Sequence, residues 1–288
     1  MKTRLLIKVA VAVCISLYSM LAAAQGIVVT KTDGTKLYFK AEEVKSVGVY
    51  GYGEEPQPEG GTYTANGVSF EMVAVEGGTF QMGGEDPIGD PDELPAHEVT
   101  VKSFVIGQTE VTQELWNAVM DDYPFPMIGG GQNPVRGVSW FGCQEFITKL
   151  NQLTGQKFRL PTEAEWEFAA RGGNLSKGYT YSGSNDLDEV AWYIENNDSI
   201  IHDVGTKAPN ELGIYDMSGN VWEWCQDWYG SDYYANSPAD NPTGPVSGSQ
   251  RVGRGGGYLS TPKGCRVIDR GDPDPGRGYS FYGFRLAL

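Results

Sequence analysis

Two segments in the second half of the chain combine tryptophan, carboxylate and glycine at fixed offsets: Arg159–Gly172 and Gly213–Trp228. A plain hydrophobic core does not need this combination, so the two segments limit the folds that the chain can adopt. In the first, Thr162 and Glu165 stand at the spacing of a capping box, just after a proline. Gly172 and Gly173 then indicate where a helix would end. The pattern predicts a structural helix from Thr162 to Ala170.

The second segment contains too many glycines and aromatic residues for a regular helix. It places Asp216 and Glu223 on either side of a predicted turn at Gly219 and Asn220. Oxygen ligands held on a turn suit a hard cation such as Ca²⁺. This segment is therefore the first candidate for a metal site. The alternative is that the two carboxylates only cap the turn.

Several further motifs follow one another along the chain. They are Met72–Gly83, Pro95–Val101, Thr109–Thr112, Pro134–Trp140, Arg254–Tyr258 and Gly283–Arg285. Together with the two segments above, they resemble the sulfatase-modifying-factor family, whose active members are formylglycine-generating enzymes. The resemblance covers Gly67 to the C-terminus. It implies an irregular, turn-rich α+β domain with a C-type-lectin-like fold.

The resemblance also implies a calcium site in the second segment. Its ligands would be the side chains of Asp216 and Glu223 and the carbonyl groups of Gly219 and Val221. These four groups supply part of a calcium shell, and water or other groups would complete it. A second calcium site of the family uses an asparagine directly after an alanine. This chain has Trp192 at that place, so the second site is not expected.

The oxidase activity of the family requires two cysteines that hold copper(I) between soft thiolates. In active relatives both lie in the loop that corresponds to Tyr258–Arg266. One alignment of this loop places them on Ser260 and Cys265, and another leaves neither cysteine, so both alignments lose the pair. Gly257 and Phe281 also replace a serine and an asparagine of the family. We therefore expect calcium but not copper.

Cysteine and histidine are scarce in the rest of the chain. Cys143, Cys225 and Cys265 remain once Cys14, which lies in a predicted signal peptide, is removed. An oxidising compartment would allow one disulfide among the three, and the sequence leaves the pairing open. Neither of the two histidines has a second histidine or a cysteine at ligand spacing, so zinc is not expected.

The N-terminus has the pattern of a secretory signal over residues 1–24: basic residues around an apolar run, followed by three alanines. We expect a short β segment over residues 25–50, a linker rich in proline, glycine and acidic residues over 51–66, and the main domain over 67–288. The exported protein would be periplasmic, on the cell surface or secreted.

Charge and hydropathy exclude two classes of partner. Loss of three basic residues with the signal leaves 19 basic against 37 acidic residues, a formal charge of −18. Such a chain is not expected to bind nucleic acid. No later apolar run approaches the ~20 residues that a membrane-spanning helix requires.

Apolar spacing predicts two more helices in the domain, Thr112–Met120 and Ser139–Leu153. Four residues of the second recur on one face and are expected in the core: Cys143, Phe146, Ile147 and Leu150. The acidic stretch Gly83–Glu93 is expected to be a solvated turn.

The sequence supports functions of two different classes. The first is a calcium-stabilised, non-catalytic binding or scaffold module, with an aromatic cleft near Trp222, Tyr258 and Phe281 for a protein or glycan ligand in the envelope. The alternative for these aromatic residues is plain core packing. The second function is a formylglycine-generating oxidase that matures exported sulfatases, with copper held by Cys265 and an unexpected partner. We expect the binding module.

Overall fold

The computed structural model of this chain describes residues 27–30, 36–39, 59–85, 89–120 and 131–288. The chain divides into two compact units, residues 1–56 and 57–288. In the first, β1 (Ile27–Thr30) and β2 (Lys36–Phe39) pair in antiparallel fashion. These strands lie within the segment where short strands were expected. The predicted signal peptide, the turn between β1 and β2 and the first half of the predicted linker (51–58) lie outside the described residues.

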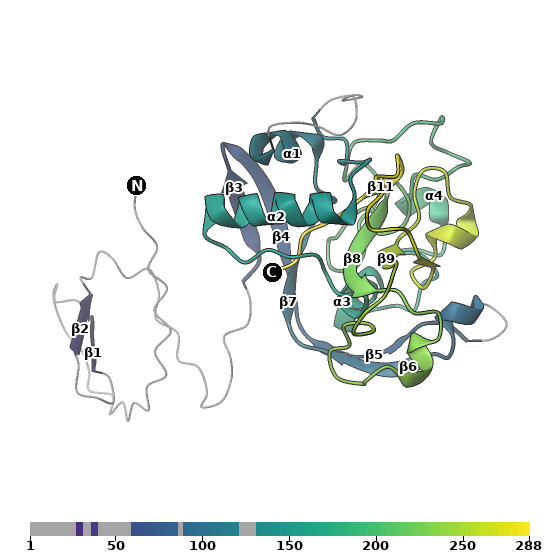
Figure 1. Ribbon diagram of the computed structural model, residues 1–288, viewed down its shortest axis with the longest axis horizontal. Helices are drawn as coiled ribbons and strands as arrows, with labels where there is room; N and C mark the ends of the chain where they lie inside the picture. The colour runs from purple at the N-terminus through teal and green to yellow at the C-terminus, as the bar shows by residue number, and fades with distance from the viewer. Residues whose placement is uncertain (1–26, 31–35, 40–58, 86–88, 121–130) are drawn as a thin grey trace. The chain divides into compact units, whose positions relative to one another are not determined.

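Three small sheets build the second unit (Figure 1). Its strands are β3 (Gly61–Ala65), β4 (Val68–Val75), β5 (Gly78–Met82), β6 (His97–Val101), β7 (Phe104–Gly107), β8 (Trp222–Trp228), β9 (Arg251–Arg254), β10 (Arg270–Gly271) and β11 (Tyr282–Gly283). The strand orders are β3-β4-β7, β5-β6 and β10-β9-β8-β11. Within these sheets β11 pairs with β8 in parallel, and the other pairs are antiparallel.

The helices of the described residues are short and few. They are α1 (Gln113–Val119), α2 (Trp140–Thr154), α3 (Glu163–Ala170) and α4 (Leu187–Val190), with 3₁₀ turns η2 (Pro91–Glu93), η3 (Gly173–Leu175), η4 (Tyr233–Asn236) and η5 (Pro262–Cys265). The hydroxyl groups of Thr112, Ser139 and Thr162 cap α1, α2 and α3. The three predicted helices are thus confirmed, each to within one residue at either end, and the predicted capping box of α3 is formed.

The folded unit begins earlier than the expected boundary at Gly67. β3 lies inside the predicted linker and pairs along its whole length with β4. Asn66 and Gly67 join the two strands with φ angles of 45° and 90°. An Asn-Gly pair between two strands is a strong hairpin signal, because both residues tolerate the left-handed conformation that a tight hairpin turn requires. The linker is correspondingly shorter than expected.

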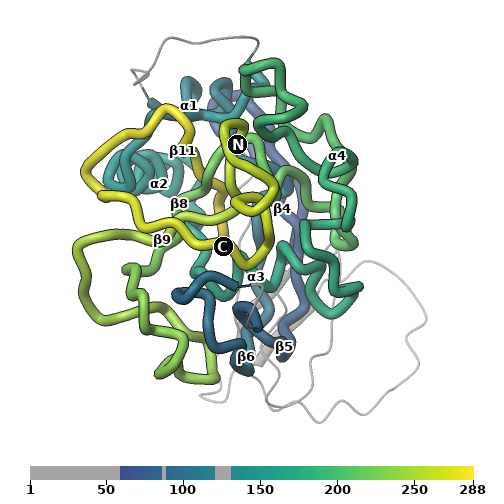
Figure 2. Tube along the Cα trace, turned by 90° about the vertical axis from the view of Figure 1, so that its right-hand side faces the viewer, coloured from purple at the N-terminus to yellow at the C-terminus, as the bar shows by residue number. Residues whose placement is uncertain are grey.

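Two large clusters of buried side chains and a smaller one that contains Cys265 form the core of this unit. The first gathers residues of α1 and α2 around Trp224 and Phe284. It includes the four residues of α2 that the spacing placed in the core. The second surrounds α3, where Trp166 is fully buried. The β5-β6 hairpin lies at the opposite end of the unit from α1 (Figures 1 and 2).

The C-terminal segment after β11 pairs with β7. Leu288 and Val105 of β7 exchange two backbone hydrogen bonds of 3.2 and 2.8 Å. This pairing carries Arg285 into the interior, where it is fully buried. Few helices, small sheets and long connections give the irregular α+β architecture that was expected. Among the described residues, no helix has the length and apolar character needed to cross a membrane.

Candidate functional site

The Asp216–Glu223 segment forms a tight turn that leads into β8. Asp216 and Asn220 are left-handed, with φ angles of 58° and 57°. The Gly219 N–H donates to the carbonyl of Gly255 at 2.8 Å. A Cβ atom at Gly219 would lie 2.4 Å from the carbonyl oxygen of Trp192, so only glycine fits there. The turn is therefore held between two other segments of the chain.

Glu223, one of the predicted calcium ligands, forms a buried ion pair. Its carboxylate accepts hydrogen bonds from Arg285, with Nε 2.6 Å from Oε2 and Nη2 2.6 Å from Oε1. The indole N–H of Trp166 donates to Oε2 at 2.7 Å. All three side chains are fully buried. Away from water, a charged pair is tolerated when its hydrogen bonds are this complete, so Glu223 serves first to neutralise Arg285.

Asp216 approaches the same region from the start of the turn. Its Oδ2 accepts the N–H of Gly205 at 2.7 Å. Burial raises the pKa of Asp216 to about 6, and the charge of Glu223 adds to the rise. The Gly205 hydrogen bond and the guanidinium of Arg285 act in the opposite direction. A carboxylate in this setting gains from a cation beside it.

A third carboxylate, Glu110, completes the group, and sequence reasoning missed it. Its oxygens accept hydrogen bonds from the side-chain amide of Asn220 at 3.0 Å and from the N–H of Val221 at 3.2 Å. Burial raises the pKa of Glu110 well above its ordinary value, and the nearby carboxylates raise it further. The sequence did contain an indication of Glu110, because this residue lies in the Thr109–Thr112 motif. No role had been assigned to that motif.

Arg285 pairs directly with Glu223, and its charge also acts to lower the pKa values of Glu110 and Asp216. The three carboxylates outnumber this guanidinium. This excess of buried negative charge is costly unless the carboxylates bind protons or a cation. Carboxylate and carbonyl oxygens are the donors that Ca²⁺ prefers. The buried carboxylates of the site are therefore of the chemical type that calcium binds. Glu223 would have to share an oxygen with Arg285 in order to take part.

An aromatic stack occupies the place where the resemblance put a second calcium ligand. The ring of Trp192 stacks on His202, with a centroid distance of 3.7 Å and an interplanar angle of 14°. Lys207 Nζ lies over the same ring, 4.1 Å from the centroid. The indole N–H of Trp192 donates to Thr206 Oγ1 at 2.8 Å. Aromatic and cation–π contacts thus hold this loop.

The three residues of the predicted aromatic cleft lie on adjacent stretches of backbone. The Trp222 N–H donates to the carbonyl of Phe281 at 2.9 Å, and the Tyr258 N–H donates to the carbonyl of Asn220 at 2.7 Å. The Trp222 indole N–H donates to Ser260 Oγ at 3.1 Å. Trp222, Tyr258 and Phe281 are each half-buried. They are thus neither fully in the core nor freely exposed.

The three cysteines of the described residues are free thiols, and all are buried. Cys143 lies in α2, Cys225 in β8 and Cys265 at the end of η5. Burial raises the pKa of Cys265 to about 12, and the carboxylate of Asp269 adds to this effect. The pKa values of Cys143 and Cys225 are also well above their ordinary value, in both cases first because of burial.

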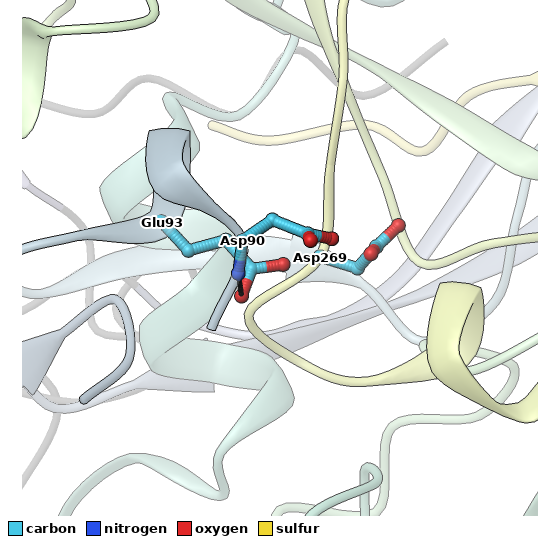
Figure 3. A group of neighbouring side chains, drawn as sticks. All are labelled: Asp90, Glu93 and Asp269. Atoms are coloured by element: carbon cyan, nitrogen blue, oxygen red, sulfur yellow. Dashed lines mark hydrogen bonds between the residues drawn. The ribbon is translucent and has the colours of Figure 1, made fainter. Parts of the chain in front are cut away.

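An acidic group brings Asp90 and Glu93 close to Asp269 (Figure 3). Arg266 lies among them, 2.7 Å from a Glu93 oxygen and 3.2 Å from an Asp269 oxygen. Lys263 pairs with Asp90 at 2.6 Å. The expectation of a solvated turn is wrong for Glu93, which is fully buried because Arg266 neutralises it. These contacts make the group an ion-pair cluster.

Comparison with known proteins identifies the same family that the motifs resemble. Residues 62–288 match the Sulfatase-modifying factor enzyme 1-like domain. The chain is 34% identical over 261 residues to the serine/threonine-protein kinase pkn1 of Chlamydia pneumoniae, which covers 81% of this chain and 39% of the kinase. The chain therefore spans about two-fifths of that relative. It is 31% identical to the formylglycine-generating enzyme of Thermomonospora curvata, with 75% of this chain and 92% of the enzyme covered.

A solved structure supports the fold. Treponema denticola variable protein 1 superimposes with a TM-score of 0.74 and 34% sequence identity, covering 81% of this chain and 99% of that protein. The irregular α+β fold of the sulfatase-modifying-factor type, inferred from the motifs, is thereby confirmed. Over residues 62–288, the chain belongs to the sulfatase-modifying-factor family.

Proposed function

We propose that this protein is an exported binding or scaffold module that does not oxidise cysteine to formylglycine. One observation carries the proposal. The loop Tyr258–Arg266 contains a single cysteine, Cys265, and its thiol is fully buried, with a pKa of about 12. A single buried thiol leaves this loop without the second soft ligand that copper(I) requires.

The other cysteines offer no substitute for the missing partner. Copper(I) needs two soft ligands that face each other in an accessible place. Cys143 and Cys225 belong to α2 and β8, away from the loop in sequence, and both are fully buried. A substrate cysteine would also need access to the metal. This argument favours a module that keeps the fold and lacks the oxidase chemistry.

The oxidase assay tests this proposal directly. The reduced mature protein is titrated with copper(I) and incubated with oxygen and a Cys-x-Pro-x-Arg peptide, which is then analysed by mass spectrometry. We expect no peptide aldehyde, and no change in the Cys265→Ser variant. The Thermomonospora curvata enzyme serves as the positive control. Aldehyde that forms with the parent protein and disappears with Cys265→Ser would establish the oxidase instead.

We also propose that calcium stabilises the module through Asp216 and the carbonyl groups of Gly219 and Val221. Support comes from the buried carboxylates of Glu110, Asp216 and Glu223, whose charges act on one another, and from the left-handed turn that contains Asp216 and Asn220. Ligand binding to the native state alone raises the free energy of unfolding by RT ln(1 + [L]/Kd), about 2.7 kcal/mol at a hundredfold excess over Kd.

Thermal melting with calcium and with a chelator checks the calcium proposal. The parent protein should melt several degrees higher with calcium, and Asp216→Asn should remove that difference. Glu223→Ala is unsuitable, because it would leave Arg285 buried without a partner at a cost of about 3–5 kcal/mol. Glu145→Gln, at an exposed site on α2, is the matched control and should keep the calcium effect. Identical melting curves for the parent in both conditions would contradict the proposal.

The binding role itself is proposed for the aromatic residues Trp222, Tyr258 and Phe281. All three are half-buried, and backbone hydrogen bonds join their segments. Tyr258 is the first residue of the loop that corresponds to the copper-binding loop of active relatives. Loops on a rigid base are a common location for recognition, and fold alone does not decide function. A protein or glycan of the envelope is the proposed ligand.

A further inference from the structure

Two loops beside the aromatic residues expose large apolar side chains. Ile194 is 51% exposed, Ile200 52% and Leu259 50%. These are three of the seven exposed large hydrophobic residues in the described part of the chain, and they come from only two loops. The Ile194 N–H donates to the carbonyl of Ser260 at 3.1 Å, which joins the loops. Exposed apolar residues on two loops that are joined through their backbone indicate an interaction site.

The loop that carries Ile194 and Ile200 is held in a defined conformation. The Ile200 N–H donates to the carbonyl of Asn197 at 3.0 Å across a turn whose central residues, Asp198 and Ser199, have φ angles of 53° and 65°. Neither is glycine, so the turn is strained. The buried Asn197 amide locks it by donating to the carbonyl groups of Tyr193 and Tyr258.

Strain of this kind persists only where the surroundings enforce it. The Trp192 stack described above anchors the beginning of the loop to His202 and Lys207. The turn therefore keeps Ile200 exposed to solvent, and the loop does not need to be ordered when a partner arrives. A preformed surface avoids part of the entropic cost of binding.

The charge around these apolar residues is negative. Glu195 and Asp198 are exposed on the same loop. Two described lysines, Lys207 and Lys263, are already engaged: Lys207 donates to the carbonyl of Asp188 at 2.5 Å, and Lys263 pairs with Asp90 at 2.6 Å. Apolar side chains beside exposed carboxylates complement a segment that combines leucine or isoleucine with lysine or arginine.

We propose that Ile194, Ile200 and Leu259, with Glu195 and Asp198 beside them, form a docking face for a basic, apolar segment of a protein partner. This rests on the binding role proposed above and names the class of its ligand. The acidic residues disfavour an anionic lipid surface or an anionic glycan at the same place.

Peptide binding tests the docking face. The mature full-length protein is titrated with three fluorescent peptides of equal length: one with leucine and lysine, one with the same leucines and glutamate, and one with the same lysines and serine. We expect only the leucine-lysine peptide to bind. The double variant Ile194→Ser/Leu259→Ser should weaken its affinity by about tenfold or more. Leu175→Ser, a change at an exposed apolar residue of η3, is the control and should leave affinity unchanged.

A charge variant separates electrostatic attraction at this face from general attraction to an acidic protein. Glu195→Gln/Asp198→Asn should weaken binding and reduce its dependence on ionic strength. Thermal melting of each variant checks that the fold is intact. Equal affinity of the parent and the Ile194→Ser/Leu259→Ser variant, or equal binding of the glutamate peptide, would overturn the proposal. The oxidase assay is independent of this result, so failure of either proposal is recognisable by itself.

Discussion

The role of Glu223 depends on residues that are remote in the sequence. Its place in the Gly213–Trp228 segment indicates a calcium ligand, yet its two carboxylate oxygens accept hydrogen bonds from Arg285 and Trp166. The partners lie 62 and 57 residues away. The same carboxylate can cap a turn, bind a metal or neutralise a cation, and only its neighbours in space decide among these roles.

Trp166 is both a core side chain and a hydrogen-bond donor to that ion pair. Trp166→Ala should lower the free energy of unfolding by about 3–5 kcal/mol, because it removes a fully buried ring and leaves a cavity. Trp166→Phe keeps most of the apolar volume but loses the donor to Glu223, so a smaller loss of about 1–3 kcal/mol is expected. Urea unfolding measures both values. An alanine variant as stable as the parent would show that the ring contributes nothing to the core.

At the scale of elements, the helix ends follow from local chemistry. Thr162 Oγ1 accepts the N–H of Glu165 at 3.2 Å, and a Glu165 oxygen accepts the N–H of Thr162 at 2.9 Å. The same carboxylate binds both terminal nitrogens of Arg159 at 2.6 and 2.7 Å. All these groups lie within seven residues of one another, which is why the sequence predicted the start of α3 correctly.

Loss of this cap should weaken the whole second unit, because α3 carries Trp166 into the core. Thr162→Ala should lower the free energy of unfolding by about 1 kcal/mol. Thr162→Ser keeps the hydroxyl and should lose much less. Chemical denaturation of the two variants side by side makes the comparison. If serine proved as destabilising as alanine, the methyl group rather than the cap would be responsible.

At the scale of the whole molecule, buried charge connects segments that are far apart in the chain. Arg266 reaches Glu93 across 173 residues, and Arg270 reaches Glu163 across 107. Breaking such pairs is costly because the remaining charge is left without a partner. The long connections of this fold are therefore tied together by ion pairs as well as by apolar packing.

Stability should fall as the pH rises through the acidic range. Burial raises the pKa of Asp269 from 3.8 to about 7, and the charge of Glu93 adds to the rise. Between these values the folded state binds a proton that the unfolded state releases, so the free energy of unfolding decreases from about pH 4 to about pH 7. Because a tenfold difference in proton affinity between the two states is worth about 1.4 kcal/mol, the total decrease is on the order of a few kcal/mol.

Urea unfolding in the presence of a chelator measures this dependence. Asp269→Asn should flatten the decrease, because its side chain does not titrate. Asp232→Asn, at an exposed site, is the matched control and should behave like the parent. If the free energy of unfolding decreased with pH just as steeply in Asp269→Asn, the titrating group would be another carboxyl group.

The sequence by itself determined the family, the three helices, the capping box of α3 and the buried face of α2. Each of these rests on contacts between residues close in the chain or on spacing that repeats within one element. The hairpin at Asn66 and Gly67 was equally local, and its signal was overlooked because the segment had been assigned to a linker. No tertiary information was needed to predict it.

The tertiary structure decided the chemistry of the candidate site. Glu110 and Arg285 join Asp216 and Glu223 only because the segment before α1, the turn before β8 and the C-terminal segment meet in the interior. Cys265 is inaccessible for a similar reason, since other segments close around its loop. Burial and ion pairing depend on which segments surround a residue in space. A pattern along the chain indicates which residue types are present, but their protonation, partners and exposure follow from packing.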